Sequence, residues 1–157
     1  MKLRKILFSF DGRIGRRTYW LALLALIAAV LVLTFAPFLL GNEEWVFLIL
    51  ALTSQFIWLL SLWPLLAVGS KRLHDRNKNS WWLLVFWLVP FALICGGFSI
   101  ILFDDPRTGR TGDFATGGVL LFASLLPALF GIIELGILPG TRGPNQYGAD
   151  PAEQATA

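Results

Sequence analysis

Residues 45–75 read WVFLILALTSQFIWLLSLWPLLAVGSKRLHD, and the architecture of the chain follows from this stretch. Residues 45–68 contain no charged side chain, and Lys71, Arg72, His74 and Asp75 follow shortly afterwards. A membrane-spanning helix needs about 20 mainly apolar residues. The stretch therefore predicts a helix that crosses a membrane and continues beyond the hydrocarbon to about Asp75.

Three further stretches have the same character. Residues 20–40 and 81–103 carry no charge, and residues 119–138 carry one, Glu134. Core helices of soluble proteins rarely run this long without a polar face. We therefore predict an all-α membrane protein, a bundle of four transmembrane helices over residues 20–40, 45–68, 81–103 and 119–138. The apolar spacing within residues 2–10 predicts a short interfacial helix in front of them.

The composition agrees with an integral membrane protein. Of 157 residues, 56% are hydrophobic and 15% are charged, and the mean hydropathy is +0.68. Soluble domains carry about 45–50% apolar and about 25% charged residues, so disorder is excluded and a soluble globule is disfavoured. We expect one integral membrane domain over residues 1–151 and a frayed tail over residues 152–157.

The composition also argues against metal and cofactor sites. One cysteine, Cys95, excludes an intrachain disulfide, and one histidine, His74, excludes a polyhistidine metal site. Residues 104–113 are rich in Asp and Gly but lack the ligand spacing of a calcium loop. We therefore predict no metal ion and no cofactor.

The distribution of basic residues predicts the orientation. If the N-terminus is inside, 11 of the 13 Lys and Arg lie on the inner side, and the outer side has Arg107 and Arg110. The positive-inside rule then places both termini in the cytoplasm. Basic loops against an anionic leaflet account for the pI of about 9.4, so no nucleic-acid partner is expected.

Polar residues gather in three segments on the predicted inner side. They are FDGRIGRRTYW at residues 10–20, KRLHD at 71–75 with SWW at 80–82, and GTRGPNQYGADP at 140–151. We predict that Asp11 caps the first long helix. We also predict that Arg13, Arg16, Arg17 and Trp20, spaced i, i+3, i+4 and i+7, share one of its faces.

These segments resemble a bacterial inner-membrane family catalogued as domain of unknown function 805. Its pattern is similar to F-x-G-R-x-x-R-x-x-[YF]-W, then R-R-L-H-D…S-x-W-W, then G…G-x-N-x-[YF]-G-x-D-P. The matching residues are Phe10, Gly12, Arg13, Arg16, Tyr19, Trp20, Arg72, Leu73, His74, Asp75, Ser80, Trp81, Trp82, Gly140, Gly143, Asn145, Tyr147, Gly148, Asp150 and Pro151. Lys71 stands where Arg is usual. The resemblance covers residues 8–151 and implies a small multi-span protein of the bacterial inner membrane, without an established activity.

The three segments have two alternative interpretations, a ligand site and an internal ionic lattice. Arginine binds phosphate or carboxylate through two parallel hydrogen bonds, and histidine titrates near physiological pH. The candidate ligand-binding residues are Arg13, Arg16, Arg17, Arg72, His74, Asp75, Asn145 and Tyr147. Their ligand would be an anionic phospholipid headgroup or a partner protein. The alternative is an internal lattice in which Asp11, Asp75, Glu134 and Asp150 pair with the arginines and clamp the helices.

Glu134 is the one charge within a span, about 6 Å from its inner end at 1.5 Å per residue. We predict a structural ion pair with Arg13, Arg16 or Arg72. The alternative is an ion or proton relay.

We predict no catalytic residue. His74 and Asp75 are adjacent, so on a helix their side chains point about 100° apart, and no nucleophile motif accompanies them. The sequence favours a binding or accessory protein in the bilayer, with a membrane protein or a second copy as partner. A small oligomeric transporter or channel is the alternative, followed by an enzyme that acts on lipid headgroups.

Overall fold

The computed structural model describes residues 3–40, 44–103 and 113–154. These residues form helices, and the described ranges contain no β-strand, only an isolated bridge between Asn145 and Gly148. Four helices are long and apolar enough to cross a membrane, which confirms the all-α, four-span fold class. The location of the termini stays a prediction.

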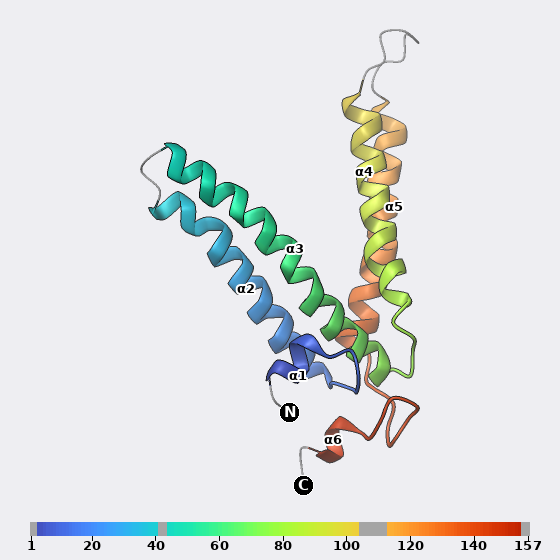
Figure 1. The fold of residues 1–157 in the computed structure, drawn as a ribbon. Coiled ribbons are helices and arrows are strands. Elements are labelled where there is room, and N and C mark those ends of the chain that lie inside the picture. Colours follow the sequence, from blue (N-terminus) through green and yellow to red (C-terminus); the bar gives the residue numbers. More distant parts are fainter. Residues whose placement is uncertain (1–2, 41–43, 104–112, 155–157) are drawn as a thin grey trace. The chain divides into compact units, whose positions relative to one another are not determined.

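Contacts divide the chain into two compact units, Met1–Lys78 with Pro139–Ala157, and Asn79–Leu138. Each unit is described separately below (Figure 1). The expectation of one membrane domain over residues 1–151 stays a prediction.

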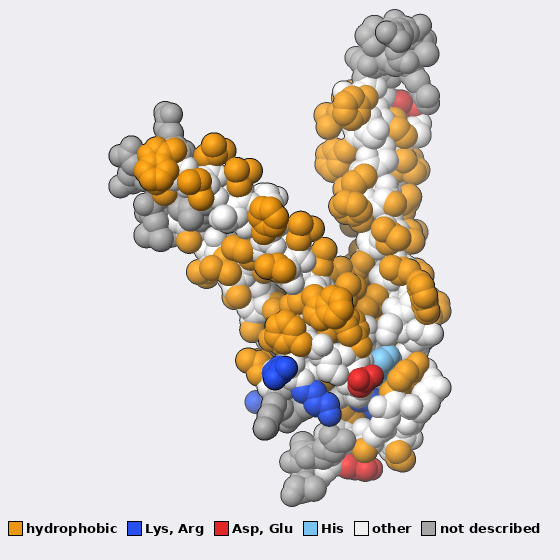
Figure 2. All heavy atoms as spheres, in the orientation of Figure 1, with side chains coloured by type: hydrophobic (Ala, Val, Ile, Leu, Met, Phe, Trp, Pro, Cys, Tyr) orange, Lys and Arg blue, Asp and Glu red, His pale blue; other side chains and the backbone are white. Residues whose placement is uncertain are grey.

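The first unit contains α1 (Leu3–Phe8), α2 (Arg16–Leu40), α3 (Glu44–Asp75) and α6 (Pro151–Gln154). α2 and α3 lie side by side as a hairpin (Figure 1). On the face drawn in Figure 2, hydrophobic side chains line the hairpin, and charged side chains gather at the end where α1 and α6 lie. An apolar surface of this kind suits contact with lipid tails, which are as apolar as the side chains. α3 ends at Asp75, as the sequence predicts.

The best-buried residues of this unit lie towards the C-terminal end of α3. Ala67, Val68 and Leu73 are at most 1% exposed, and Ile14 from the segment before α2 is 2% exposed. The ring of Phe10 packs edge-on against Trp63, with 5.2 Å between the ring centroids. The chain between α1 and α2 is therefore held against the last turns of α3.

Two predictions about the start of α2 are wrong. The helix begins at Arg16, so Arg13 does not share a face with Arg16 and Arg17, and Asp11 does not cap the helix. The backbone N–H of Ile14 donates instead to the carbonyl of Lys71 at 3.4 Å, and Gly12 turns the chain with φ of +91°. As a result Arg13 is buried while Arg16 and Arg17 are exposed.

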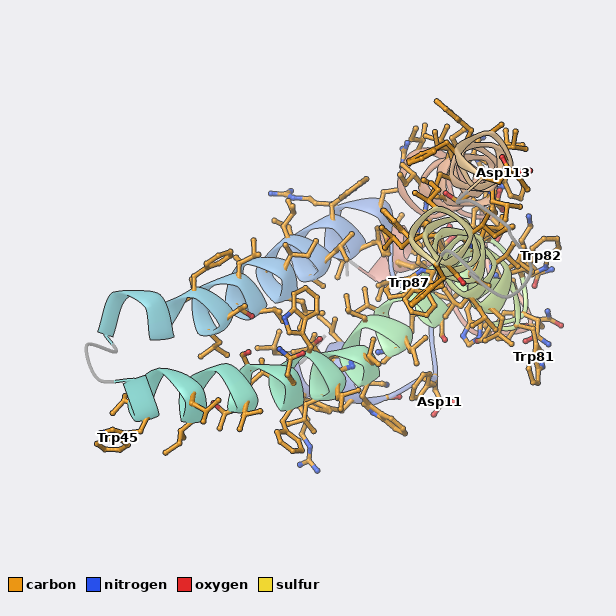
Figure 3. All side chains as sticks on the ribbon, turned by 90° about the horizontal axis from the view of Figure 1, so that it is seen from above. Asp11, Trp45, Trp81, Trp82, Trp87 and Asp113 are labelled. Atoms are coloured by element: carbon orange, nitrogen blue, oxygen red, sulfur yellow. The ribbon has the colours of Figure 1, made fainter. Side chains whose placement is uncertain are left out.

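The exposed position of Asp11 agrees with this correction. Its side chain projects from the ribbon at the end of the unit opposite Trp45 (Figure 3). Its backbone N–H donates to the Ser9 hydroxyl at 3.1 Å. Asp11 is therefore part of the turn before α2.

The second unit pairs α4 (Val89–Leu102) with α5 (Phe114–Ile132). A π-helical turn extends each partner, η1 (Leu84–Leu88) before α4 and η2 (Ile133–Ile137) after α5. Asp113 caps α5 by accepting the N–H groups of Ala115 and Thr116 at 3.0 Å each. Glu134 lies in η2 and is 2% exposed.

Two glycines let α4 and α5 approach closely. A Cβ built on Gly97 would lie 2.9 Å from the carbonyl oxygen of Gly117, and one on Gly117 would lie 2.4 Å from Ile101 Cγ1. Small residues at helix contacts allow backbones to approach in membranes, where van der Waals packing drives association. Gly97 and Gly117 therefore set the spacing of this pair.

We expect Gly117→Ala to lower the free energy of unfolding by about 1–3 kcal/mol, because the added methyl overpacks the contact. Gly118→Ala is the matched control. Apart from its chain neighbours and the nearby backbone of its own helix, no described atom lies within 4 Å of a Cβ built on Gly118. Alanine at that position should be neutral or stabilising by about 0.5–1 kcal/mol. Thermal unfolding of the two variants in one detergent measures the difference, and equal destabilisation would contradict the assigned contact.

Candidate functional site

Asp75, the last residue of α3, lies at the centre of a buried ionic cluster in the first unit. Its Oδ1 accepts Arg13 Nη2 at 3.0 Å and Arg13 Nε at 3.2 Å. Its Oδ2 accepts Arg72 Nη1. The side chains of the three residues are 1%, 0% and 5% exposed for Arg13, Arg72 and Asp75. One carboxylate is thus shared by two guanidinium groups, as the lattice interpretation anticipates for these residues.

Arg13 also binds the backbone of the C-terminal tail. Its Nη1 donates to the carbonyls of Gly143 at 2.7 Å and Gly148 at 3.2 Å, and its Nη2 donates to that of Thr141 at 2.6 Å. The planar fork of donors can serve several acceptors in fixed directions. Arg13 therefore joins the tail to the end of α3.

The tail is also attached through its own backbone. Thr141 N–H donates to the Asp75 carbonyl at 2.8 Å. A Cβ on Gly140 would lie 2.0 Å from Asp75 Oδ2. The tail can therefore approach the carboxylate this closely only with glycine at position 140.

Asn145 and Tyr147 complete the attachment. Asn145 Nδ2 donates to the His74 carbonyl and to Thr141 Oγ1, both at 2.9 Å, and its Oδ1 accepts the Tyr147 N–H at 2.9 Å. The Tyr147 ring stacks on His74 with centroids 3.9 Å apart and planes 3° apart. These two predicted site residues hold the tail in place.

The structure gives His74 and Asp75 separate partners. His74 Nδ1 lies 3.3 Å from the carbonyl oxygen of Gly12, whereas the Asp75 carboxylate binds Arg13 and Arg72. A catalytic pair needs the base oriented by its acidic partner. This arrangement does not provide that geometry.

Asp150 closes the tail loop on itself. Its Oδ1 accepts the N–H of Ala152 and its Oδ2 that of Gly143, both at 2.9 Å. These two N–H groups, and more weakly Arg13, hold the pKa of the Asp150 carboxyl below its ordinary value. Asp150 is therefore a carboxylate at neutral pH.

Lys71 anchors α1, a role that sequence reasoning missed. The residue is fully buried, and its Nζ donates to the carbonyls of Lys5, at 2.6 Å, and Ile6. A cation near the C-terminal end of a helix satisfies carbonyls that lack partners within the helix. The signal available was only that Lys71 stands among the charged residues at the end of α3.

An open pocket of about 220 Å³ lies beside the ionic cluster, within the first unit. It is lined by Gly15, Arg16, Arg72, Asp75, Pro139, Gly140, Thr141, Arg142, Asp150, Pro151 and Ala152. Three arginines and two carboxylates share this lining, so positive charge is in excess. Pockets for drug-sized ligands hold about 300–1,000 Å³, so this one suits a smaller group.

The predicted site residues thus separate into three sets. Arg16, Arg72 and Asp75 line the pocket. Arg13, His74, Asn145 and Tyr147 hold the tail that forms its other wall. Arg17 is exposed on α2 and is not among the lining residues. Glu134 belongs to the second unit, and its ion pair stays a prediction.

Arg142 and Thr141 line the pocket but were missed as ligand candidates. Both stand in the third polar segment, so their presence there was the available signal. Within the described ranges no group of three or more His, Cys, Asp and Glu could hold a metal ion. The Asp- and Gly-rich segment 104–113 lies outside those ranges except for Asp113.

We expect Asp75→Asn to destabilise the protein by about 3–5 kcal/mol, because it leaves two buried guanidinium groups without their carboxylate. Asp11→Asn removes the same charge at an exposed residue. Its free energy of unfolding should stay within about 0.5 kcal/mol of that of the parent. Thermal unfolding and limited proteolysis of the tail measure the effect. A tail that stays resistant to protease in the Asp75→Asn protein would contradict its anchoring by the cluster.

The pKa of Asp150 predicts an acid-sensitive tail. A carboxyl whose folded pKa is lowered stabilises the fold above its unfolded pKa of about 3.9, and this contribution is lost as the pH falls through the folded value. Hydrogen exchange at the Gly143 and Ala152 amides should therefore show constant protection down to about pH 4 and a loss below it. In Asp150→Asn the protection should not change with pH over this range. If the Asp150→Asn protein lost protection at the same pH as the parent, the transition would belong to another titrating group and the prediction would be wrong.

Comparison with known proteins adds the family context. The profile of the family described as "Protein of unknown function (DUF805)" matches residues 7–149. The uncharacterized protein YiiR of Escherichia coli K12 is 35% identical over 150 residues, which cover 96% of this chain and 90% of YiiR. No solved structure matches the chain significantly.

Two further relatives are named as inner membrane proteins. YhaH of Escherichia coli K12 is 31% identical over 117 residues, covering 72% of this chain and 88% of YhaH. YhaI of the same strain is 28% identical over 116 residues, covering 74% of this chain and 89% of YhaI.

Proposed function

The chain belongs to the DUF805 family of inner-membrane proteins, and we propose that it is a binding protein whose pocket holds the anionic phosphate of a lipid headgroup. The family is uncharacterised, so the proposal rests on the pocket. The observation that carries it is the meeting of Arg16 and Arg142 in one small cavity, beside Arg72, which is already paired with Asp75.

The chemistry of the lining suits phosphate. Guanidinium groups form charge-assisted, often paired hydrogen bonds with phosphate oxygens. α2 begins at Arg16, and the first backbone N–H groups of a helix, together with its dipole, also favour an anion. Gly15 and Arg16 both line the pocket, so the start of the helix and the arginine side chains support the same type of ligand.

The position along α2 suits a headgroup. Trp20 follows Arg16 by one turn, about 6 Å along the helix axis, and its side chain is exposed. Tryptophan is enriched where the hydrocarbon meets the polar headgroups. A pocket one turn before this residue lies at the depth of lipid phosphates, on the side that the positive-inside rule assigns to the cytoplasm.

Other functions have less support. His74 and Asp75 bind different groups, which disfavours an enzyme built on that pair. A transporter or channel stays an untested alternative. A protein partner, or a second copy of the chain, would be the other ligand of the basic pocket. Lipid adducts in native mass spectrometry distinguish a lipid ligand from these.

Native mass spectrometry of the full chain in a mild detergent tests the proposal. The probes are phosphatidylethanolamine, phosphatidylglycerol and diacylglycerol, the last of which lacks phosphate. We expect phospholipid adducts without a diacylglycerol adduct. Arg16→Gln and Arg142→Gln should each weaken phospholipid binding about tenfold or more, because a hydrogen bond to a charged group contributes about 1.5–3 kcal/mol.

Arg17→Gln is the matched control, because Arg17 is an exposed neighbour outside the pocket lining. It should bind like the parent. Equal weakening by Arg17→Gln would mean that only general basic charge attracts lipid. Equal adducts with diacylglycerol would overturn the phosphate site. Arg72 is unsuitable for this test because its substitution also disrupts the ionic cluster.

A further inference from the structure

The pocket contains negative as well as positive side chains. Asp75 already binds Arg13 and Arg72 through its two oxygens. Asp150 lines the same pocket, and each of its oxygens accepts one backbone N–H. A carboxylate oxygen can accept more than one hydrogen bond, so Asp150 retains capacity for a cationic donor.

Building on the proposed function, we infer that the pocket selects a zwitterionic ligand, a phosphate joined by a short linker to a primary ammonium, as in the phosphoethanolamine headgroup. The phosphate binds Arg16 and Arg142, and the ammonium binds Asp150. This names a narrower ligand class than any phosphate-bearing lipid.

The charge distribution favours this class over a purely anionic headgroup. A phosphatidylglycerol headgroup would place its negative charge in the same small cavity as the Asp150 carboxylate, with nothing of its own to offset the repulsion. A primary ammonium replaces this repulsion with an attraction. The N–H groups of Ala152 and Gly143 hold the carboxylate in place and keep its pKa low, so Asp150 is charged at neutral pH.

The lining also distinguishes a primary from a quaternary ammonium. Proteins recognise quaternary ammonium groups with aromatic cages. Among the described residues that line the pocket none is aromatic. A primary ammonium has N–H donors that a carboxylate accepts directly, whereas a choline headgroup has none.

The size of the pocket fits the same ligand. Pockets for drug-sized ligands hold about 300–1,000 Å³, whereas this open pocket has a volume of about 220 Å³. Phosphoethanolamine is smaller than a drug-sized ligand, so it suits a pocket of this volume.

Competition between lipids with identical acyl chains tests the inference. The full chain in a mild detergent is mixed with equal amounts of phosphatidylethanolamine, phosphatidylglycerol and phosphatidylcholine, and adducts are counted by native mass spectrometry. We expect at least a fivefold excess of the ethanolamine lipid over each competitor, a ratio that a single ion pair of modest strength can produce.

Asp150→Asn should lose the preference for ethanolamine, so that phosphatidylglycerol binds this variant as well as or better than phosphatidylethanolamine. Glu153→Gln is the matched control, because it removes one negative charge nearby at a residue outside the pocket lining. It should keep the preference. Loss of the preference in the control would overturn the assignment to Asp150.

A second measurement needs no variant. Stepwise N-methylation of phosphatidylethanolamine removes the N–H donors one at a time, and binding to the parent protein should fall with each step to the level of phosphatidylcholine. Flat binding across the series would overturn the inference. Soluble phosphoethanolamine, added to the lipid complex, distinguishes the source of the ligand. Displacement of the lipid supports a soluble ligand, and persistence of the adduct supports a lipid, with the same recognised chemistry in both cases.

The two proposals fail in different ways. If phosphatidylglycerol binds the parent protein as well as phosphatidylethanolamine, the zwitterion inference is wrong and the phosphate site stands. If diacylglycerol binds as well as either phospholipid, the proposed function itself is wrong.

Discussion

The first unit depends on one buried carboxylate that is shared by two guanidinium groups. Burial of an ion costs several kcal/mol unless a partner compensates it, so Asp75, Arg13 and Arg72 are stable in this position only together. Arg13 in turn holds the tail through the carbonyls of Thr141, Gly143 and Gly148. The tail then supplies one wall of the pocket, so the site exists because the ionic cluster orders a segment that is rich in glycine and proline.

The buried side chains and polar contacts of this unit are concentrated at one end of the α2–α3 hairpin. Along α2 and α3 many large apolar side chains are exposed, and in a bilayer they contact lipid at no hydrophobic cost, because the lipid tails are as apolar as the side chains. Burial is densest where charged residues meet, and there Lys71 also binds the end of α1. Polar contacts at this end of the hairpin thus bury more side chains than apolar packing along α2 and α3.

Sequence reasoning identified four apolar helices long enough to cross a membrane, the extension of α3 to Asp75, and the polar residues 10–20, 71–75 and 140–151 that belong to the first unit. It failed at the start of α2, where helical spacing suggested that Arg13, Arg16 and Arg17 share a face. The spacing holds only if the helix extends back to Arg13, and the structure prevents this through the turn at Gly12 and the contact of Ile14 with the Lys71 carbonyl. That contact joins residues far apart in the chain, and no local pattern signals it. The three arginines consequently have three different environments.

The span positions and their lengths follow from the order of residues alone, because transfer of an apolar helix into hydrocarbon depends on the composition of that segment and little else. The concentration of basic residues in a few segments outside the apolar stretches is equally local and can be counted along the chain. The assignment of each charge to a cluster, a pocket wall or an exposed helix face required the folded arrangement. Burial and pairing depend on which groups, distant in the chain, come within hydrogen-bonding distance of one another. Arg13, Asp75 and the tail reach that distance only after α3 has packed against the segment before α2 and against the tail.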